Sequence, residues 1–445
     1  MRAEAEARPA PRFGWGRTQV IALKGPFFWL CAFYVVYCAR PEDWIPGLAL
    51  IPLAKITGLI AFIGLLTSLG QAKRGFKDMP REATFLLVMI GILYVSALLS
   101  PVWRGGAFSH TTDFAKVYVV WVLTFMLLTE ISRMRRLIFI QSASVAVICM
   151  VSMIKGHSQP RLEGVIGGIY SNPNDLAFAI VLSLPFCLAF LLTTKGAVKK
   201  LGWIFSMLAM LTALFLTASR GGFITLVVSG LVILWHFGVK GKRRYLIVAS
   251  VLIGSALLGV AGRPLMQRMV AVSGVQTQED ASAVASYEQR KFLMSKALEG
   301  IAKYPILGMG VGNFQIFSTA WRDVHMTYLQ IAVEGGIPSL VLYVLFFLSG
   351  FRNLRILRRR TKTLDAESSL FAAALHSSMI GFVVGACFAP EAYQFFPYFT
   401  VAYTSALLAM VREQDEAASP VSNPLKQSQS RSEVYARSGA LSPVR

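Results

Sequence analysis

The stretch "FLTASRGGFITL", from Phe215 to Leu226, places an arginine and two glycines between two long apolar runs. An arginine is costly to bring near hydrocarbon, so Arg220 needs a partner or a task. The run before it, 203–218, and the run after it, 222–238, each approach the roughly 20 residues with which a helix crosses a bilayer. The stretch therefore predicts a hairpin of two membrane-spanning helices with Arg220 at its turn.

Apolar runs of this kind recur along the whole chain. Its 445 residues are 55% apolar and have a mean hydropathy of +0.56, which is unlike a soluble globular domain. We predict an all-α polytopic membrane protein with about 12 transmembrane helices. The predicted spans are 20–39, 50–70, 84–100, 113–131, 137–155, 174–193, 203–218, 222–238, 245–262, 326–349, 368–388 and 396–411.

The net charge of +21 follows a pattern that fits membrane topology better than nucleic-acid binding. Basic residues gather in alternate loops, which read "KRGFKDMPR", "RMRR", "KGAVKK", "KGKRR" and "RNLRILRRRTK". Because such loops face the cytoplasm, both termini are predicted to lie inside. No nucleic-acid partner is expected.

This topology divides the chain into five segments. One large outward loop, 263–325, separates spans 9 and 10. The other segments are an N-terminal cytoplasmic tail (1–19), spans 1–9 (20–262), spans 10–12 (326–411) and a disordered cytoplasmic tail (412–445).

The outward loop contains a predicted amphipathic helix between Ser286 and Lys303. By helical phase, Arg290 lies within the apolar stripe of this helix and Lys291 lies near its edge. An arginine on a buried stripe is penalised unless an anion or an acidic partner receives it, which makes Arg290 a candidate ligand-binding residue. Lys291 can face lipid headgroups. The predicted stripe consists of Tyr287, Met294, Leu298 and Ile301.

The segment after this helix carries a candidate base. The glycines of "YPILGMGVGNF" (304–314) predict a tight turn at the membrane surface and do not fit a dinucleotide-binding fingerprint. His325 precedes span 10 and shares the outer face with Arg220 and Arg290. Glu334 lies deeper in that span, where an acidic residue is either functional or makes a helix-packing hydrogen bond.

Two arginines and a histidine at one membrane face suit a lipid-linked diphosphate substrate. Guanidinium groups bind phosphate oxygens bidentately and stay charged, and a histidine can take the proton of an acceptor hydroxyl. The outward loops have no D-x-D pair and their carboxylates are scattered along the chain, so we predict a metal-independent reaction without a cofactor. The alternative for Arg220 is that it snorkels to lipid phosphates.

Four motifs in order resemble the O-antigen ligase/polymerase family over roughly residues 165–350. They are "YSNPND" at the start of a span, "ASRGG" between spans, "YEQRKFLMSKALEGIAKYPILGMGVGNF" and H-x-x-"YLQIAVEGGIP". The resemblance implies a glycosyltransferase whose active site faces the periplasm from the bacterial inner membrane. It implies an undecaprenyl-diphosphate-linked glycan as donor, membrane lipids as surroundings, and a lipid A core, a lipid-linked glycan or a protein as acceptor.

The family pattern also assigns roles residue by residue. Arg220 matches the arginine of the hairpin motif, Arg290 matches the arginine that opens the large-loop helix, and His325 matches the histidine proposed as base. These three are predicted to be catalytic. Met326 departs from the Asn or Ser usual after the histidine. The predicted substrate-binding residues are Ser219, Lys291, Asn172, Asn174 and Glu334, although the two asparagines can equally serve as a helix cap.

Other functions stay open at the level of sequence. A polymerase of the same family differs from a ligase only in its acceptor, and we favour the ligase. A polysaccharide flippase would place ionisable residues near the bilayer midplane and often show repeats. Here the unusual polar residues gather at the outer ends of spans, except Glu334. A non-catalytic scaffold is the remaining alternative.

Overall fold

The computed structural model describes residues 23–155, 161–163, 170, 172–263, 265–266, 278–359 and 364–418, and in these ranges every regular element is helical. Each predicted span corresponds to a helix. The helices are α2 (Lys24–Ala39), α4 (Leu53–Thr67), α5 (Arg81–Leu98), α6 (Arg104–Leu127), α7 (Ile131–Lys155), α8 (Pro173–Thr193), α9 (Ala197–Leu216), α10 (Arg220–Leu234), α11 (Tyr245–Ala261), α15 (Thr327–Arg359), α16 (Ala366–Gly385) and α17 (Phe395–Ala418).

Seven helices of the described chain are long and apolar enough to cross a membrane, which makes this a multi-pass membrane protein. They are α5, α7, α8, α9, α15, α16 and α10 together with η4 (Trp235–Lys240), its π-helical continuation. The shorter apolar helices are α2, α4 and α11. The total of about 12 spans stays a prediction.

Several helices extend beyond the predicted apolar runs, because a helix continues where its backbone bonds are satisfied whether or not its side chains are apolar. α6 begins at Arg104 and α15 continues to Arg359. α17 ends at Ala418, inside the segment predicted to be a disordered tail, and the rest of that tail lies outside the described residues.

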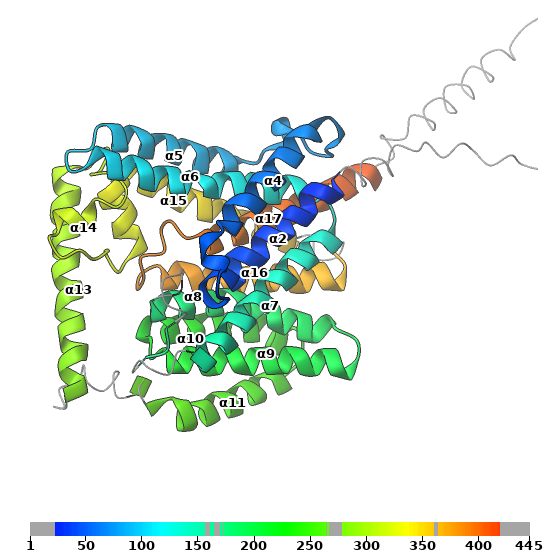
Figure 1. Cartoon of the computed structure of the whole chain (residues 1–445). Helices are drawn as coiled ribbons and strands as arrows, with labels where there is room; N and C mark the ends of the chain where they lie inside the picture. Colours follow the sequence, from blue (N-terminus) through cyan, green and yellow to red (C-terminus); the bar gives the residue numbers. More distant parts are fainter. Residues whose placement is uncertain are drawn as a thin grey trace, which may run out of the picture.

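The helices pack around α8, which is buried on nearly all sides and contacts α7, α9, α10 and α16. α5 packs against both α6 and α15, and α17 packs against α6 and α15. Large apolar side chains such as Leu59, Leu231 and Leu252 are exposed on outer helices, as expected for surfaces that lipid covers. Figure 1 shows these helices running roughly alongside one another, with α13 (Gln278–Lys303) crossing one end of the bundle beside α14 (Phe314–Phe317).

The helix predicted at 286–303 is confirmed as the C-terminal part of α13, but of its predicted stripe only Ile301 packs against the protein. Tyr287, Met294 and Leu298 are 53%, 50% and 51% exposed, whereas Leu293 and Ala297 are fully buried. The buried face packs against α15 and the preceding loop. It does so through small residues: a Cβ on Gly300 would lie 2.6 Å from Val333 Cγ2 and 2.7 Å from Met309 Cε. Arg290 is half-buried at the edge of this face.

The glycine-rich loop 304–314 makes the predicted tight turn, with positive φ at Gly308, Gly310 and Gly312. It packs against a break in α15, where the Met309 and Gly310 amides donate to the carbonyls of Val333 and Glu334 (3.0 and 2.8 Å). Ser100 Oγ donates to the Met309 carbonyl from the α5–α6 connection (2.6 Å). The loop is thereby fixed against two helices.

Gly336 forms the break in α15, and its replacement by alanine is expected to lower the melting temperature of the purified protein. Its φ of 77° is unfavourable for other residues, and a Cβ would lie 2.2 Å from the Ile306 carbonyl oxygen. The backbone strain alone costs about 1–3 kcal/mol. The control is Gly202→Ala, since Gly202 is in α9 with nothing within 4 Å of its Cβ position. Equal melting temperatures for both variants would contradict this account of the break.

Candidate functional site

The turn between α9 and α10 is built by a helix cap. Ser219 is the N-cap of α10, because its Oγ accepts a hydrogen bond from the Gly222 amide (3.1 Å). The same hydroxyl donates to Asn174 Oδ1 at the start of α8 (2.7 Å). Asn172 caps α8, because its Oδ1 accepts the Asn174 amide (3.0 Å). Ser219 and Asn174 thus join two helix N-termini, and Asn172 serves as a helix cap whereas the Asn174 side chain accepts the Ser219 hydroxyl.

Arg220, half-buried, is the first residue of α10. The two glycines after it allow neighbouring protein to approach closely. A Cβ on Gly221 would lie 2.7 Å from Phe388 Cβ, and one on Gly222 would lie 2.6 Å from Ala177 Cβ. These glycines therefore press the start of α10 onto α8 and onto the loop after α16.

This loop, residues 386–394, also holds the start of α15. Thr327 donates its amide to the Ala386 carbonyl (2.8 Å) and its hydroxyl to the Ala389 carbonyl (2.7 Å). The same hydroxyl accepts the Glu391 amide (3.0 Å). Since Thr327 is two residues after His325 and Phe388 packs on Gly221, the loop connects the helix of Arg220 to the segment of His325.

His325 lies beside two arginines, outside the membrane-spanning helices. Burial, followed by the charges of Arg290 on α13 and of Arg322, lowers its pKa to about 4. The imidazole is therefore neutral above about pH 4, the form that can accept a proton. Its Nδ1 is buried and no described group hydrogen-bonds to it. Arg322 in turn donates to Gln289 Oε1 on α13 (2.9 Å).

Two carboxyl groups that we expected to be scattered are neighbours in the fold. Glu391 is buried in the loop after α16, and burial, followed by the nearby carboxylate of Asp175 on α8, raises its pKa well above the usual value. Such a setting favours the neutral, protonated form of the carboxyl group. The pair lies within the same group of helix N-termini as Ser219 and Thr327.

The raised pKa of Glu391 predicts a pH-dependent stability. The folded state keeps this carboxyl neutral, whereas in the unfolded chain it ionises above about pH 4.3. Stability is therefore lost as pH rises from there towards the folded pKa. Glu391→Gln cannot ionise, so its melting temperature should fall less between about pH 5 and about pH 8 than that of the native protein. The exposed Glu299→Gln is the control; identical slopes for all three proteins would refute the neutral carboxyl.

The remaining predicted residues occupy different surroundings. Glu334 is fully buried and its Oε1 accepts the Gly312 amide (2.9 Å), so it fixes the glycine-rich loop in the manner of a packing hydrogen bond. Lys291 is exposed on α13. Met326 packs with the apolar cluster under α13.

The structure thus places Arg290 near enough to His325 for its charge to lower the pKa of the imidazole, and the loop 386–394 joins the start of α10, where Arg220 lies, to the segment of His325. Sequence reasoning missed Arg322 and the contact of Asp175 with Glu391. The spacing of Arg322, three residues before His325, was an available signal. Among the described residues no group of three or more His, Cys, Asp or Glu side chains could hold a metal ion; metal independence remains a prediction.

The fold and these contacts define a multi-pass membrane protein with a cluster of polar and basic groups where α8, α10 and α15 begin. Comparison with known families gives a more particular result: residues 205–344 match the family model described as O-antigen ligase. This confirms the resemblance predicted from the motifs: over these residues the chain is similar to O-antigen ligases. The matched segment runs from α9 into α15 and contains Arg220, Arg290 and His325. No curated protein matches the chain.

Proposed function

We propose that the protein is a membrane glycosyltransferase of the O-antigen ligase type. It moves a glycan from undecaprenyl diphosphate to an acceptor hydroxyl at the outer face of the inner membrane. The observation that carries the proposal is the position of Arg290 beside His325 within the segment that matches the O-antigen ligase family.

The reaction needs groups for the leaving diphosphate and for one proton. The acceptor oxygen bonds to the anomeric carbon, the bond from that carbon to the phosphate oxygen breaks, and undecaprenyl diphosphate leaves. Arg290 and Arg220 stabilise the charge that develops on the phosphate. His325, neutral across the physiological range, takes the hydroxyl proton.

Helix ends add to this electrostatic environment. The start of α10 presents amide groups next to Arg220, and α8 and α15 begin nearby. The N-terminus of a helix carries a partial positive charge that favours phosphate. These backbone dipoles support the same ligand as the arginines.

An apolar cavity of about 360 Å³ beneath the α9–α10 turn suits the isoprenoid part of the donor. Phe215 and Phe223 flank the turn that carries Arg220, and both line this cavity. Its other walls come from α8 and α11, including Val181 and Leu257. A polyprenyl chain seated here would place its diphosphate at the level of Arg220.

The proposed topology puts both termini in the cytoplasm and His325 in the periplasm. His325 precedes α15, whereas the basic residues Arg352, Arg355 and Arg359 lie near its other end. Positively charged ends of spans face the cytoplasm.

The test is deletion of the gene followed by analysis of where the surface glycan accumulates. A ligase predicts an uncapped lipid A core and glycan retained on undecaprenyl diphosphate. Single repeat units would instead indicate a polymerase, and lipid-linked units that face the cytoplasm would indicate a flippase. A surface glycan unchanged by the deletion would contradict the proposed function.

A further inference from the structure

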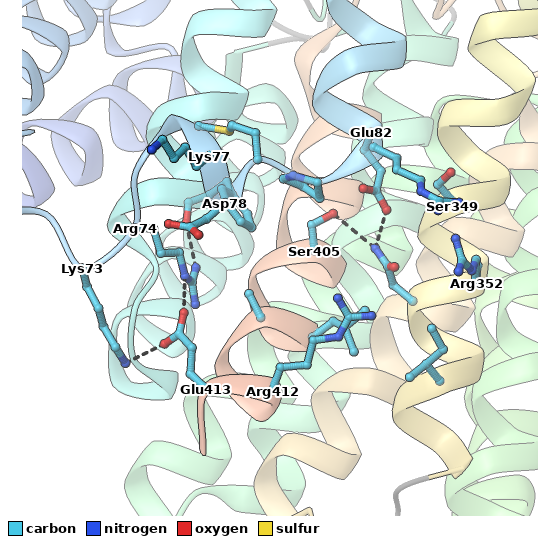
Figure 2. A pocket seen from close by; sticks show the side chains of 18 of the residues that line it. Lys73, Arg74, Lys77, Asp78, Glu82, Ser349, Arg352, Ser405, Arg412 and Glu413 are labelled. Carbon is cyan, nitrogen blue, oxygen red and sulfur yellow. Dashed lines mark hydrogen bonds and ion pairs between the residues drawn. The ribbon is translucent and has the colours of Figure 1, made fainter. Parts of the chain in front are cut away.

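A polar cavity of about 560 Å³ lies between the start of α5, the C-terminal half of α15 and the C-terminal part of α17 (Figure 2). Four acidic side chains line it, namely Asp78, Glu82, Glu413 and Glu416. The basic residues that line it are six, namely Lys73, Arg74, Lys77, Arg81, Arg352 and Arg412. The lining therefore carries an excess of positive charge.

Much of the acidic charge is already engaged. Glu413 forms ion pairs with Lys73 and Arg74, through Oε2 to Lys73 Nζ (2.5 Å) and through Oε1 to Arg74 Nε (2.6 Å). Glu82, buried at the start of α5, accepts Asn353 Nδ2 (2.6 Å) from α15. Figure 2 shows both groups of contacts within the cavity.

Most of the basic side chains that line the cavity are not paired with a described acidic group. Among the described residues Lys77, Arg81, Arg352 and Arg412 form no hydrogen bond or ion pair. Their side chains are exposed at the rim. An anion that enters the cavity can therefore pair with these four cations without breaking an existing ion pair within the protein.

Arg74 marks the inner wall of the cavity. Its side chain is only 2% exposed, and its Nη1 donates to the carbonyls of Phe125 and Leu128 (2.8 and 2.9 Å) at the end of α6. Its Nη2 is buried, and no described group accepts a hydrogen bond from it. A buried guanidinium nitrogen without an acceptor is costly, and an anionic oxygen would remove that cost.

We propose that this cavity binds the phosphate group of an anionic membrane lipid. Phosphate oxygens suit guanidinium donors, and basic pockets between membrane helices are known to hold lipid headgroups. Met79, Pro80, Ile356 and Leu408 line the same cavity and offer apolar surface to the glycerol and the first acyl carbons. The site lies at the end of the spans, where headgroups lie, and it does not depend on the proposed glycan transfer.

The test measures lipid binding to the purified full-length protein by native mass spectrometry, with added phosphatidylglycerol or zwitterionic phosphatidylcholine. The native protein should prefer phosphatidylglycerol by about tenfold or more, the effect expected from hydrogen bonds to a charged group. R352Q/R412Q should lose this preference without unfolding, since both arginines are exposed. Arg355→Gln should keep it, because Arg355 is exposed on the same helix but does not line the cavity.

Inorganic phosphate distinguishes the source of the ligand. If phosphate alone raises the melting temperature of the native protein and not of R352Q/R412Q, while phosphatidylglycerol binds no better than phosphatidylcholine, the lipid assignment is overturned in favour of a soluble phosphate ester. If R352Q/R412Q binds phosphatidylglycerol as well as Arg355→Gln and the native protein do, the site itself is refuted.

Discussion

A protein carrying His325→Ala is expected to lose glycan transfer while it still binds undecaprenyl diphosphate. Removal of a general base costs about 100- to 10,000-fold in rate, whereas the arginines proposed to hold the diphosphate stay in place. The measurement is kcat/KM for transfer by purified protein in nanodiscs, with donor affinity measured separately. His236→Ala is the control, since it removes an imidazole near Arg358 at the other end of the bundle.

The pH profile adds a second readout for His325. Because burial, Arg290 and Arg322 lower its pKa to about 4, kcat/KM should decline on the acidic side near pH 4. An unperturbed histidine would give a decline near pH 6.5. Transfer by His325→Ala at more than about a tenth of the native rate would remove the imidazole from the mechanism.

Arg290→Gln is expected to reduce kcat/KM by about 100- to 1,000-fold, the cost of losing one donor to a developing negative charge. It should also move the acidic decline to higher pH, because the charge of Arg290 no longer lowers the pKa of His325. Arg290→Lys keeps that charge and loses the bidentate contact. It should therefore lower the rate and leave the acidic decline in place.

Arg322→Gln is the matched control for this experiment. Arg322 also lowers the pKa of His325, but we assign it no contact with the diphosphate. Its loss should shift the acidic decline upwards and leave donor affinity near the native value. If Arg290→Gln and Arg322→Gln behave alike in donor affinity, Arg290 does not hold the diphosphate.

The sequence predicts the helices well where apolar length and a capping residue coincide. The hairpin around Ser219 is an example, because a serine before two glycines both ends one apolar run and caps the next helix. Other predicted spans, such as those at α2, α4, α5 and α9, follow from apolar length alone, since these helices have no side-chain cap. The ends of the helices cannot be predicted in this way, since charged residues such as Arg104 and Arg359 continue a helix as well as apolar residues do.

The sequence does not predict contacts that depend on small residues or on segments far apart in the chain. The inner face of α13 was misassigned because Met294 and Leu298 are more apolar than Ala297 and Gly300, and the latter two pack closely because they are small. The contact of Asp175 with Glu391 joins segments far apart in the chain, and no local pattern indicates it. Arg290 and His325 were selected from local sequence patterns, and their roles stay predictions.

The central claim is that Arg220, Arg290 and His325 surround one diphosphate, and a structure of the protein with bound undecaprenyl diphosphate tests it most directly. Electron cryo-microscopy of that complex should place the two phosphates between the arginines, with the imidazole beside the position of the anomeric carbon. Phosphate density at the opposite end of the bundle, or arginine side chains directed away from it, would contradict the account.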